Sequence, residues 1–466
     1  MTLRANVPDD HSLHRQLTLR DLVFSQILSV VGSSWVGLAA GLGHAQTLVW
    51  MFSFATFYFP MAAAVYYLNR EMPLEGGIYV WARRAFGDTT GFLVAWNVWL
   101  YGLLLIATVL FQLPSELAFM IGPSAAWIPE NHLLVISAIG TLALLLALSA
   151  FRGLSLGKWI HNISGISVLL AYALLIAAPF WAMLHHVPIH YTPLELHLPK
   201  RDLVSLALIA QILFASSGLE YVAIMAGESN APSRDIGRSI LIASPIAVLM
   251  FMLGTASVLA FHELSGIPIN YIAPIPQALR LAFGGSGVGT FVARFAILLL
   301  QIRIIGSASF IFTGVTRLPM TAGWDHLIPE WFSRLHPRYR TPTNSIFASA
   351  AVIALVTALA SVGVHASEAF ALLSNTNNTA YGIAYLVMFA IPICGAVFLR
   401  KTLPRWLWVV CAIGFLVVLF SVVLSAYPFL SIPSPLSFAL KVAGITGAAN
   451  IAGYVFYRAR RQEVIA

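Results

Sequence analysis

Long apolar runs separated by short polar segments extend along almost the whole chain. A helix that crosses a hydrocarbon layer of about 30 Å uses about 20 residues, and many of these runs are that long. The pattern predicts an all-helical membrane protein with twelve spans. The predicted spans lie at about 19–43, 46–69, 90–121, 132–151, 161–186, 203–228, 238–262, 288–316, 343–363, 367–399, 405–427 and 436–457.

The composition excludes a soluble enzyme. Apolar side chains make up 59% of the 466 residues and charged ones only 9%, whereas soluble domains average about 25% charged residues. The two cysteines, Cys394 and Cys411, lie in apolar runs, so we expect neither a disulfide framework nor a thiolate zinc site. Because the first twenty residues are polar and charged, we expect no signal peptide and a cytosolic N-terminus.

The basic residues predict the orientation in the membrane. If the N-terminus is cytosolic, the inner segments hold 20 of the 26 lysines and arginines, and the outer loops hold only Lys200, Arg201 and Arg280. This bias favours an even number of spans in the cell membrane, with both termini cytosolic. Since the basic residues do not cluster on a soluble face, we expect the lipid bilayer as a partner and no nucleic acid. The inner residues are Arg4, Arg15, Arg20, Arg70, Arg83, Arg84, Arg152, Lys158, Arg234, Arg238, Arg317, Arg334, Arg338, Arg340, Arg400, Lys401, Arg405, Arg458, Arg460 and Arg461.

Small and polar residues interrupt the first and the sixth predicted spans. Unwound backbone leaves N–H and C=O groups unpaired, which a membrane interior tolerates only where they line a cavity or hold a ligand. Breaks five helices apart are typical of an inverted repeat whose substrate site lies where the broken ends meet. Close packing of small residues is the alternative explanation. The two stretches are Gly32-Ser33-Ser34-Trp35-Val36-Gly37 and Ala215-Ser216-Ser217-Gly218-Leu219-Glu220.

The segment after the second predicted span carries the most specific motif of the chain. It reads Glu71-Met72-Pro73-Leu74-Glu75-Gly76-Gly77-Ile78-Tyr79-Val80-Trp81. It is similar to the pattern Glu-x-Pro-x-x-Gly-Gly-x-Tyr-x-aromatic of the amino-acid/polyamine/organocation (APC) transporter superfamily. The stretch that starts at Gly32 resembles the Gly-Ser-Gly motif of the same superfamily, with Ser34 where the second glycine usually stands.

The resemblance extends through the first ten predicted spans. The start of the third span is similar to the family through Gly91, Phe92, Trp96 and Trp99. After the sixth span, the family order is followed by Gly227, Glu228, Pro232, Arg234, Asp235 and Ile236, with Ala231 in place of an asparagine. After the eighth span, it is followed by Arg317, Met320, Asp325, Leu327, Pro329, Thr341 and Pro342, with His326 in place of a glycine. The last two spans carry no such motif.

The resemblance implies a LeuT-type fold with 12 transmembrane helices. Residues 19–186 and 203–399 would form inverted repeats of five helices each, followed by two helices at 405–457, with cytosolic tails at 1–18 and 458–466. It also implies a secondary transporter that moves an amino acid or a related amine by alternating access.

The resemblance further implies which residues meet the substrate. Gly32, Ser33 and Ser34 would bind its carboxylate, and Phe214, Ala215 and Ser216 its ammonium group. This agrees with the attraction of anions to a helix N-terminus and of cations to a C-terminus. The rest of the predicted site consists of Trp35, Gly37 and Gly218 in the interrupted stretches and of Tyr101, at a position that lines the cavity in relatives.

Two charged residues inside predicted spans have an energetic reason to be functional. An ionised carboxylate at mid-membrane costs about 2.5–3.5 kcal/mol on insertion scales, so we expect Glu220 to be paired or protonated. Its position in the family is often linked to proton coupling. The two roles left open are a proton or cation switch and a hydrogen-bonded tie between the sixth span and a neighbouring helix.

Arg303 lies deep in the eighth predicted span. It shares a helical face with Gly306, Ser307, Phe310 and Gly314, which predicts that this face points into the bundle. Many proton-dependent relatives carry a lysine in the fifth span where this chain has Val168. We hypothesise that Arg303 supplies a fixed positive charge instead and makes transport sodium-independent. The alternatives are pairing with Glu220, pairing with the substrate carboxylate, and a structural role on backbone carbonyls.

Three other polar features inside predicted spans can be explained by structural roles alone. The run Ser374-Asn375-Thr376-Asn377-Asn378-Thr379 in the tenth span either lines the permeation path or ties helices together. Arg294 and Lys441 are near enough to span ends to reach the membrane surface, and local pairing also explains Lys441.

The sequence lacks a phosphate-binding loop, a metal-ligand spacing and a catalytic constellation, so we expect no cofactor, no metal and no enzymatic activity. The leading interpretation is a sodium-independent amino acid transporter that works by proton symport or exchange. Few acids lie at mid-span, which favours neutral or anionic amino acids over cations. The alternatives are a polyamine or organic-amine carrier and a substrate-sensing receptor on a transporter scaffold.

Overall fold

The computed structural model describes residues 17–72, 76–224, 229, 232–284, 287–324, 328–361, 364–395, 402–430 and 432–465. These residues form helices joined by short connections, together with one isolated β-bridge between Leu17 and Ser229. The prediction of an all-helical chain is confirmed for the part of the chain that the structure describes.

Ten helical segments in the described residues are long and apolar enough to cross a membrane. Two of them are composite, because α3 (Gln46–Ser53) continues through the π-helical turn η3 (Phe54–Tyr58) into α4 (Phe59–Glu71), and α6 (Asp88–Leu110) continues into α7 (Gln112–Ile121). The others are α8 (His132–Phe151), α9 (Leu154–Leu184), α12 (Pro232–Ser265), α14 (Gly287–Trp324), α15 (Thr343–Ser361), α16 (Ala366–Cys394), α18 (Arg405–Leu424) and α19 (Pro435–Ile465).

The two predicted spans that contain small polar stretches are the broken ones. The first consists of α1 (Leu19–Val30) and α2 (Ser33–Ala40), which are bent by 41° relative to each other and together make an eleventh candidate span. The sixth range holds a short apolar helix, α10 (Leu203–Ala215), and a single turn, α11 (Tyr221–Ile224). Each predicted range therefore contains helical structure, in two pieces in the first and the sixth range, while the total of twelve spans and the inverted repeat remain predictions.

Several helices in the connections were not predicted. The longest are α5 (Ile78–Phe86) and α13 (Pro274–Phe283), and shorter turns are η2 (Gly43–Ala45), η4 (Pro123–Ala125) and η6 (Glu330–Phe332). The motif glycines before α5 have a structural reason, because Gly76 and Gly77 have φ angles of 95° and 47°, where side chains with a Cβ are strained. The indole of Trp81 then donates to the Met72 carbonyl over 3.1 Å and closes this turn.

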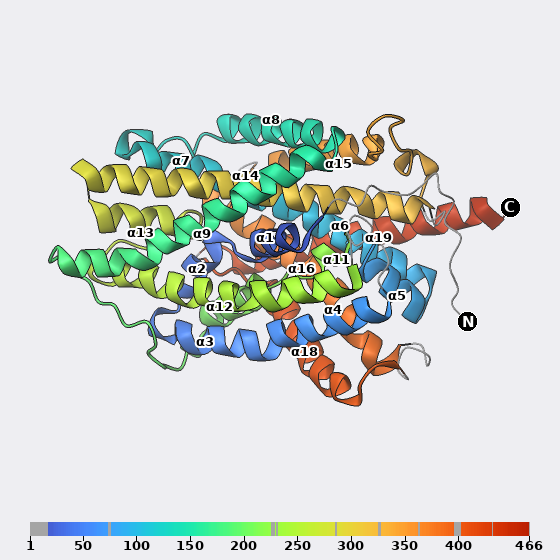
Figure 1. Cartoon of the computed structure of the whole chain (residues 1–466), viewed down its shortest axis with the longest axis horizontal. Coiled ribbons are helices and arrows are strands. Elements are labelled where there is room, and N and C mark those ends of the chain that lie inside the picture. Colours follow the sequence, from blue (N-terminus) through green and yellow to red (C-terminus); the bar gives the residue numbers. More distant parts are fainter. Residues whose placement is uncertain are drawn as a thin grey trace.

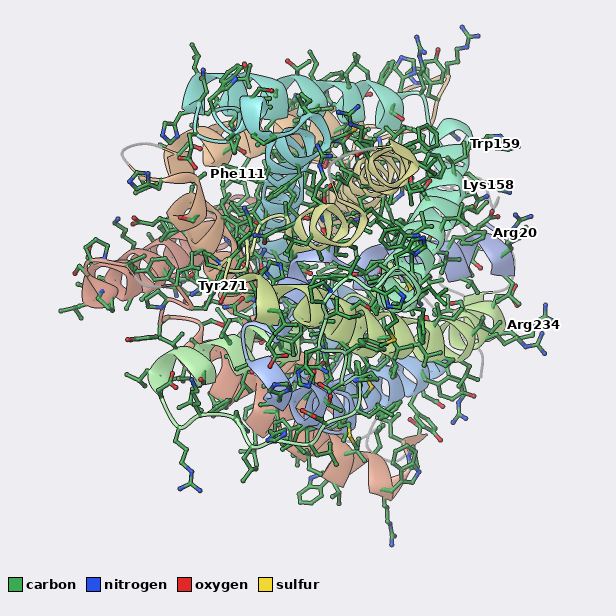
Figure 2. The ribbon with its side chains drawn as sticks, turned by 90° about the vertical axis from the view of Figure 1, so that its left-hand side faces the viewer. Arg20, Phe111, Lys158, Trp159, Arg234 and Tyr271 are labelled. Atoms are coloured by element: carbon green, nitrogen blue, oxygen red, sulfur yellow. The ribbon has the colours of Figure 1, made fainter. Side chains whose placement is uncertain are left out.

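The long helices run along the long axis of the molecule, with α8 on one side and α18 on the opposite side (Figure 1). The last turns of α19 lie at the same end of the molecule as α5. Arg20, Lys158 and Arg234 lie along one edge in Figure 2, and Lys158 Nζ lies 3.0 Å from Asp21 Oδ2. Basic residues predicted to be on the inner side thus gather in space.

The inner face of α14 packs against the first half of the chain, which confirms the prediction made for the face that carries Arg303. The Ser307 hydroxyl donates to the Leu28 carbonyl of α1 over 2.9 Å. A Cβ on Gly306 would lie 2.1 Å from Ser164 of α9, so the two helices approach at van der Waals distance only because glycine stands there. This close contact holds α14 beside the break of the first span.

Some motif residues lie outside the described part of the chain. They are Pro73, Leu74, Glu75, Gly227, Glu228, Ala231, Asp325, His326 and Leu327.

Candidate functional site

The break in the first span is shorter than the sequence predicted. Val31 and Gly32 are extended, with ψ angles of 104° and 142°, and the chain is helical again from Ser33. Trp35 therefore belongs to α2 rather than to the break. Since Gly32 offers no capping side chain, the first N–H groups of α2 are not capped in the usual way. A helix end of this kind attracts negative charge.

Arg303 of α14 lies at this break and is 1% exposed. Its Nη1 donates to the Val31 carbonyl over 3.3 Å, and its Nη2 donates to the Ser33 hydroxyl over 3.3 Å and to Gln112 Oε1 over 3.4 Å. The Val31 carbonyl lies at the C-terminal end of α1, where the helix dipole favours a cation. The guanidinium thus lies between the two halves of the first span.

A buried polar cluster from α7 surrounds the same break. Ser33 Oγ lies 2.8 Å from Gln112 Oε1 and 3.4 Å from Glu116 Oε1, and both acceptors are buried. Gln112 Nε2 donates to the Ser34 hydroxyl over 3.5 Å. The hydroxyl of Tyr172, from α9, donates to the Gly32 carbonyl over 3.2 Å. Ser33 and Ser34, which the family resemblance assigned to the substrate carboxylate, are therefore both hydrogen-bonded within the protein.

The sequence analysis missed Gln112 and gave Glu116 no role in the site. The available signal was their spacing of one helical turn, which places an amide and a carboxylate on one face of an apolar helix.

The break in the sixth span contacts the last turn of α1, beside the break in the first span. α10 ends at Ala215, and helical structure resumes at Tyr221. Gly218 has a φ angle of 112°, and a Cβ at this position would lie 3.2 Å from the Ser29 carbonyl oxygen of α1. The Ser29 hydroxyl donates to the Gly218 carbonyl over 3.3 Å. Glycine is thus required here both for its backbone conformation and for the close approach.

Glu220 is fully buried at the end of this second break. Its Oε2 accepts a 2.8 Å hydrogen bond from the Tyr385 hydroxyl of α16, which in turn accepts from the Gly218 N–H over 3.2 Å. Its Oε1 is buried without a hydrogen-bond partner among the described residues. This hydrogen bond links the sixth span to α16, and a role of Glu220 as a proton or cation switch stays a prediction. The partners of Arg303 are different residues, so these two charges belong to separate clusters.

Tyrosines gather beside Glu220. Tyr101 stacks on Tyr381 with ring centroids 3.5 Å apart, and Tyr221 lies 6.0 Å from Tyr101. The hydroxyls of Tyr221, Tyr381 and Ser216 are buried without a hydrogen-bond partner within the described ranges. Unpaired buried polar atoms cost about 1–3 kcal/mol each, and they mark where a ligand or a water molecule can bind. The sequence predicted Tyr101 and Ser216 but not the other tyrosines.

Packing explains the other residues of the predicted substrate site. A Cβ on Gly37 would lie 2.5 Å from Pro274, so this glycine lets α2 approach α13. Phe214 packs edge to face against Phe57 at 5.9 Å, and Ala215 is buried next to it in the chain. The Trp35 indole folds back to within 2.6 Å of the Cβ that Gly32 lacks.

The polar run in α16 ties helices together. Gln211 Nε2 donates to Asn375 Oδ1 over 2.8 Å, and Asn378 Nδ2 donates to Gln211 Oε1. Asn375 also donates to the Tyr427 carbonyl over 3.0 Å. Of the two explanations that the sequence left open, these contacts support interhelical packing for the asparagines.

Lys441 forms an ion pair, which was one of the two explanations that the sequence left open. Its Nζ lies 3.3 Å from Glu368 Oε1, and both side chains are partly exposed. Arg294 is exposed, in keeping with its predicted place near the membrane surface.

In a comparison with known protein families, the model of the amino acid permease family matches residues 16–448 of this chain. An uncharacterized transporter of Legionella pneumophila is 22% identical over 84% of this chain and 82% of its own length. The probable agmatine/putrescine antiporter AguD of Lactococcus lactis is 27% identical over 71% of this chain and 69% of its own. The serine/threonine exchanger SteT of Bacillus subtilis is 24% identical over 60% of each chain.

Proposed function

Because the chain belongs to the amino acid permease family, we propose that this transporter moves amino acids across the cell membrane by secondary active transport and alternating access. In this proposal the two inverted repeats span residues 19–186 and 203–399, two further helices lie at 405–457, and both termini are cytosolic. The contact between the broken first and sixth spans supports it, since substrate sites of such folds lie where broken helices meet.

The distribution of charge around the two breaks is the observation that carries the choice of substrate. The first break presents the uncapped N-terminus of α2 and the Arg303 guanidinium, which attract a carboxylate. The second break presents the C-terminal end of α10 and Glu220, which attract an ammonium group. Ser29, in the last turn of α1, and Gly218 join the two broken spans. A zwitterionic amino acid matches both ends of this arrangement, whereas a polyamine matches only one.

Arg303 supports sodium-independent transport. Its guanidinium donates to the Val31 carbonyl, which is the group at the C-terminal end of α1 that would otherwise be free to coordinate a cation. A permanent positive charge at this place makes a bound sodium ion unnecessary for holding the two halves of the span together.

Glu220 is the proposed coupling residue, which leaves proton symport and substrate exchange as the two modes. Its Oε1 has no partner among the described residues, and the tyrosine cluster shields it from bulk water. Taking up or releasing a proton here changes the charge of the second break while Tyr385 stays within hydrogen-bonding distance.

One observation favours an organic amine as the second candidate substrate. Glu220 lies beside a cluster of tyrosines, and aromatic faces bind organic cations through their quadrupoles. The similar protein AguD is a probable agmatine/putrescine antiporter. This candidate leaves the positive charge of Arg303 without a role in binding.

Uptake into proteoliposomes tests the proposal. Purified protein is reconstituted, and labelled neutral amino acids, agmatine and putrescine are offered with a sodium, a choline or a proton gradient. We expect uptake of an amino acid that is the same in sodium and choline and increases with an inward proton gradient or with internal substrate. Uptake of the amines alone would replace the amino acid assignment, and a need for sodium would remove the role given to Arg303.

A further inference from the structure

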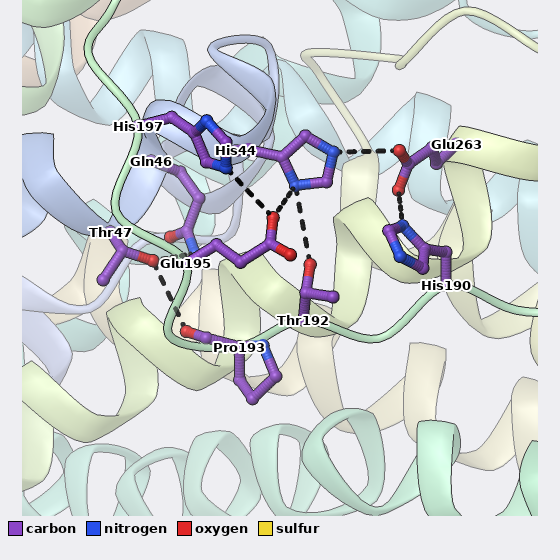
Figure 3. Close-up of polar contacts among 9 residues, drawn as sticks. All are labelled: His44, Gln46, Thr47, His190, Thr192, Pro193, Glu195, His197 and Glu263. Atoms are coloured by element: carbon purple, nitrogen blue, oxygen red, sulfur yellow. Dashed lines mark hydrogen bonds and ion pairs between the residues drawn. The ribbon is translucent and has the colours of Figure 1, made fainter.

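Three histidines and two glutamates gather at the end of the molecule where α2 and α12 terminate (Figure 3). His44 lies in η2, just beyond α2, and Glu263 lies in the last turn of α12. His190 lies in the connection between α9 and α10. Its backbone N–H donates to the Ala260 carbonyl of α12 over 3.4 Å. Three segments far apart in sequence thus meet at one place, on the predicted outer side of the membrane.

The glutamate lies between two imidazoles. His44 Nε2 lies 2.9 Å from Glu263 Oε1, and His190 Nδ1 lies 2.8 Å from Glu263 Oε2. One ligand atom from each of the three residues lies within 4.8 Å of the others. A tetrahedral zinc ion with bonds of about 2.0–2.2 Å needs ligand atoms roughly 3.3 Å apart. Small rotations of partly exposed side chains therefore convert the observed contacts into a coordination shell with one open position.

A second carboxylate orients His44 for such a role. Glu195 Oε2 lies 2.8 Å from His44 Nδ1, and His197 Nε2 lies 3.4 Å from the same oxygen. With Nδ1 beside Glu195, the ring nitrogen of His44 that faces Glu263 is Nε2. Histidines that bind metal ions usually give their other ring nitrogen to a carboxylate in this way, which fixes the tautomer. The arrangement is visible in Figure 3.

We propose that His44, His190 and Glu263 form a binding site for Zn²⁺ or a similar transition-metal ion. Two imidazole nitrogens and one carboxylate suit such ions, whereas Ca²⁺ and Mg²⁺ prefer oxygen ligands alone. The site was not foreseen from spacing, because its ligands come from separate segments. The signal in the sequence was the density of histidines in the connection, which contains His185, His186, His190 and His197.

The position of the site gives the ion a way to act on transport, and this consequence rests on the proposed function. His44 lies in η2, just beyond the end of α2 at Ala40, and the other end of α2 forms the break at Gly32. α2 also packs on α13, through the close contact of Gly37 with Pro274. An ion bound to His44, His190 and Glu263 ties α2 to α12 and to the connection after α9. Alternating access requires the broken helices to move, so the bound ion slows transport.

Calorimetric titration of the detergent-purified full chain with ZnCl₂, after removal of metals by EDTA, tests the site itself. We expect one ion per chain, and an affinity at least tenfold lower in His44→Ala, His190→Ala and Glu263→Gln. Glu195→Gln should weaken binding about 10–100-fold, because it removes the carboxylate that orients His44. Because these side chains are partly exposed, the variants should keep the unfolding temperature of the metal-free protein.

His186→Asn is the matched control, because it removes an exposed histidine of the same connection that has a φ angle of 56° and that asparagine tolerates. It should bind zinc as the unaltered chain does. Zinc binding that is equally strong in His44→Ala and His190→Ala would overturn the site, and so would the absence of saturable binding in the unaltered chain.

A separate measurement tests the consequence for transport. External ZnCl₂ should reduce substrate exchange in proteoliposomes, EDTA should restore it, and His44→Ala should abolish the inhibition. Binding without inhibition would retain the metal site and refute its link to the movement of α2. Failure to transport any amino acid would affect the proposed function and leave the calorimetric result unchanged.

Discussion

Replacing Arg303 by glutamine tests the fixed-charge hypothesis in the most informative way, since it removes the charge while keeping a hydrogen-bonding side chain. Arg303→Lys is its companion, because it keeps the charge and loses the planar fork that reaches several acceptors. The two variants separate the role of the charge from that of the geometry.

The structure sets the size of the expected loss. Arg303 donates to Val31, Ser33 and Gln112 over 3.3–3.4 Å, which is longer than the 2.7–2.9 Å of the strongest charge-assisted bonds. Each bond therefore belongs near the lower end of the range of about 1.5–3 kcal/mol for bonds to charged groups. The substitution also leaves the buried Glu116 without its nearby cation. We expect a destabilisation of about 3–5 kcal/mol from the loss of two or three such bonds.

The assay combines the thermal unfolding of both variants with uptake per folded molecule in sodium and in choline. Arg303→Gln should unfold at a lower temperature and should transport at least tenfold more slowly, which corresponds to about 1.4 kcal/mol in the barrier. Arg303→Lys should retain part of the sodium-independent uptake. Full activity of Arg303→Ala, or a sodium requirement in the unaltered protein, would refute the reasoning.

Three further predictions follow from single residues. Glu220→Gln should abolish uptake driven by a proton gradient and leave a slower substrate exchange, because the C-terminal end of α10 still attracts the ammonium group after the charge of Glu220 is lost; gradient-driven uptake at the normal rate would exclude Glu220 from coupling. Gly218→Ala should lower the unfolding free energy by about 1–3 kcal/mol, because Gly218 has a φ angle of 112°. Its control is Gly140→Ala, in open space on α8, which should stabilise the helix by up to about 1 kcal/mol. Equal unfolding temperatures of the two variants would contradict this prediction. Lys441→Ala should change stability by no more than about 1 kcal/mol, since its ion pair is partly exposed, and leave uptake unchanged.

Hydrophobic runs were sufficient to locate the long apolar helices. α8 has the predicted bounds of 132–151, and the α14 face that carries Gly306 and Ser307 lies in the interior as its helical period predicted. The period of a long apolar helix is a local property, so the sequence alone can predict it. α5 and α13 were missed because they are short and amphipathic and lie in connections, where length gives no membrane signal.

The sequence also predicted the two helix breaks, because they are local features. It did not predict which residues of distant helices contact them. Gly32 and Gly218 stand out as small residues in the middle of apolar runs. The contact of Gly218 with Ser29, and the separation of Arg303 from Glu220, depend on how distant helices pack. A single sequence contains no signal for such long-range contacts. The same holds for the outer cluster of His44, His190 and Glu263, which three segments assemble.

Thermal unfolding of the detergent-purified chain with matched ligands tests the central claim most directly. The claim is that one site binds a carboxylate at the first break and an ammonium group at the second. The panel pairs neutral amino acids with the amines and the carboxylic acids that lack one of the two groups, and includes agmatine and putrescine. We predict that an amino acid stabilises the protein, by about 2.7 kcal/mol at 100 times its dissociation constant, and that neither partial ligand does. Stabilisation by the amines alone, or by no member of the panel, would contradict the account.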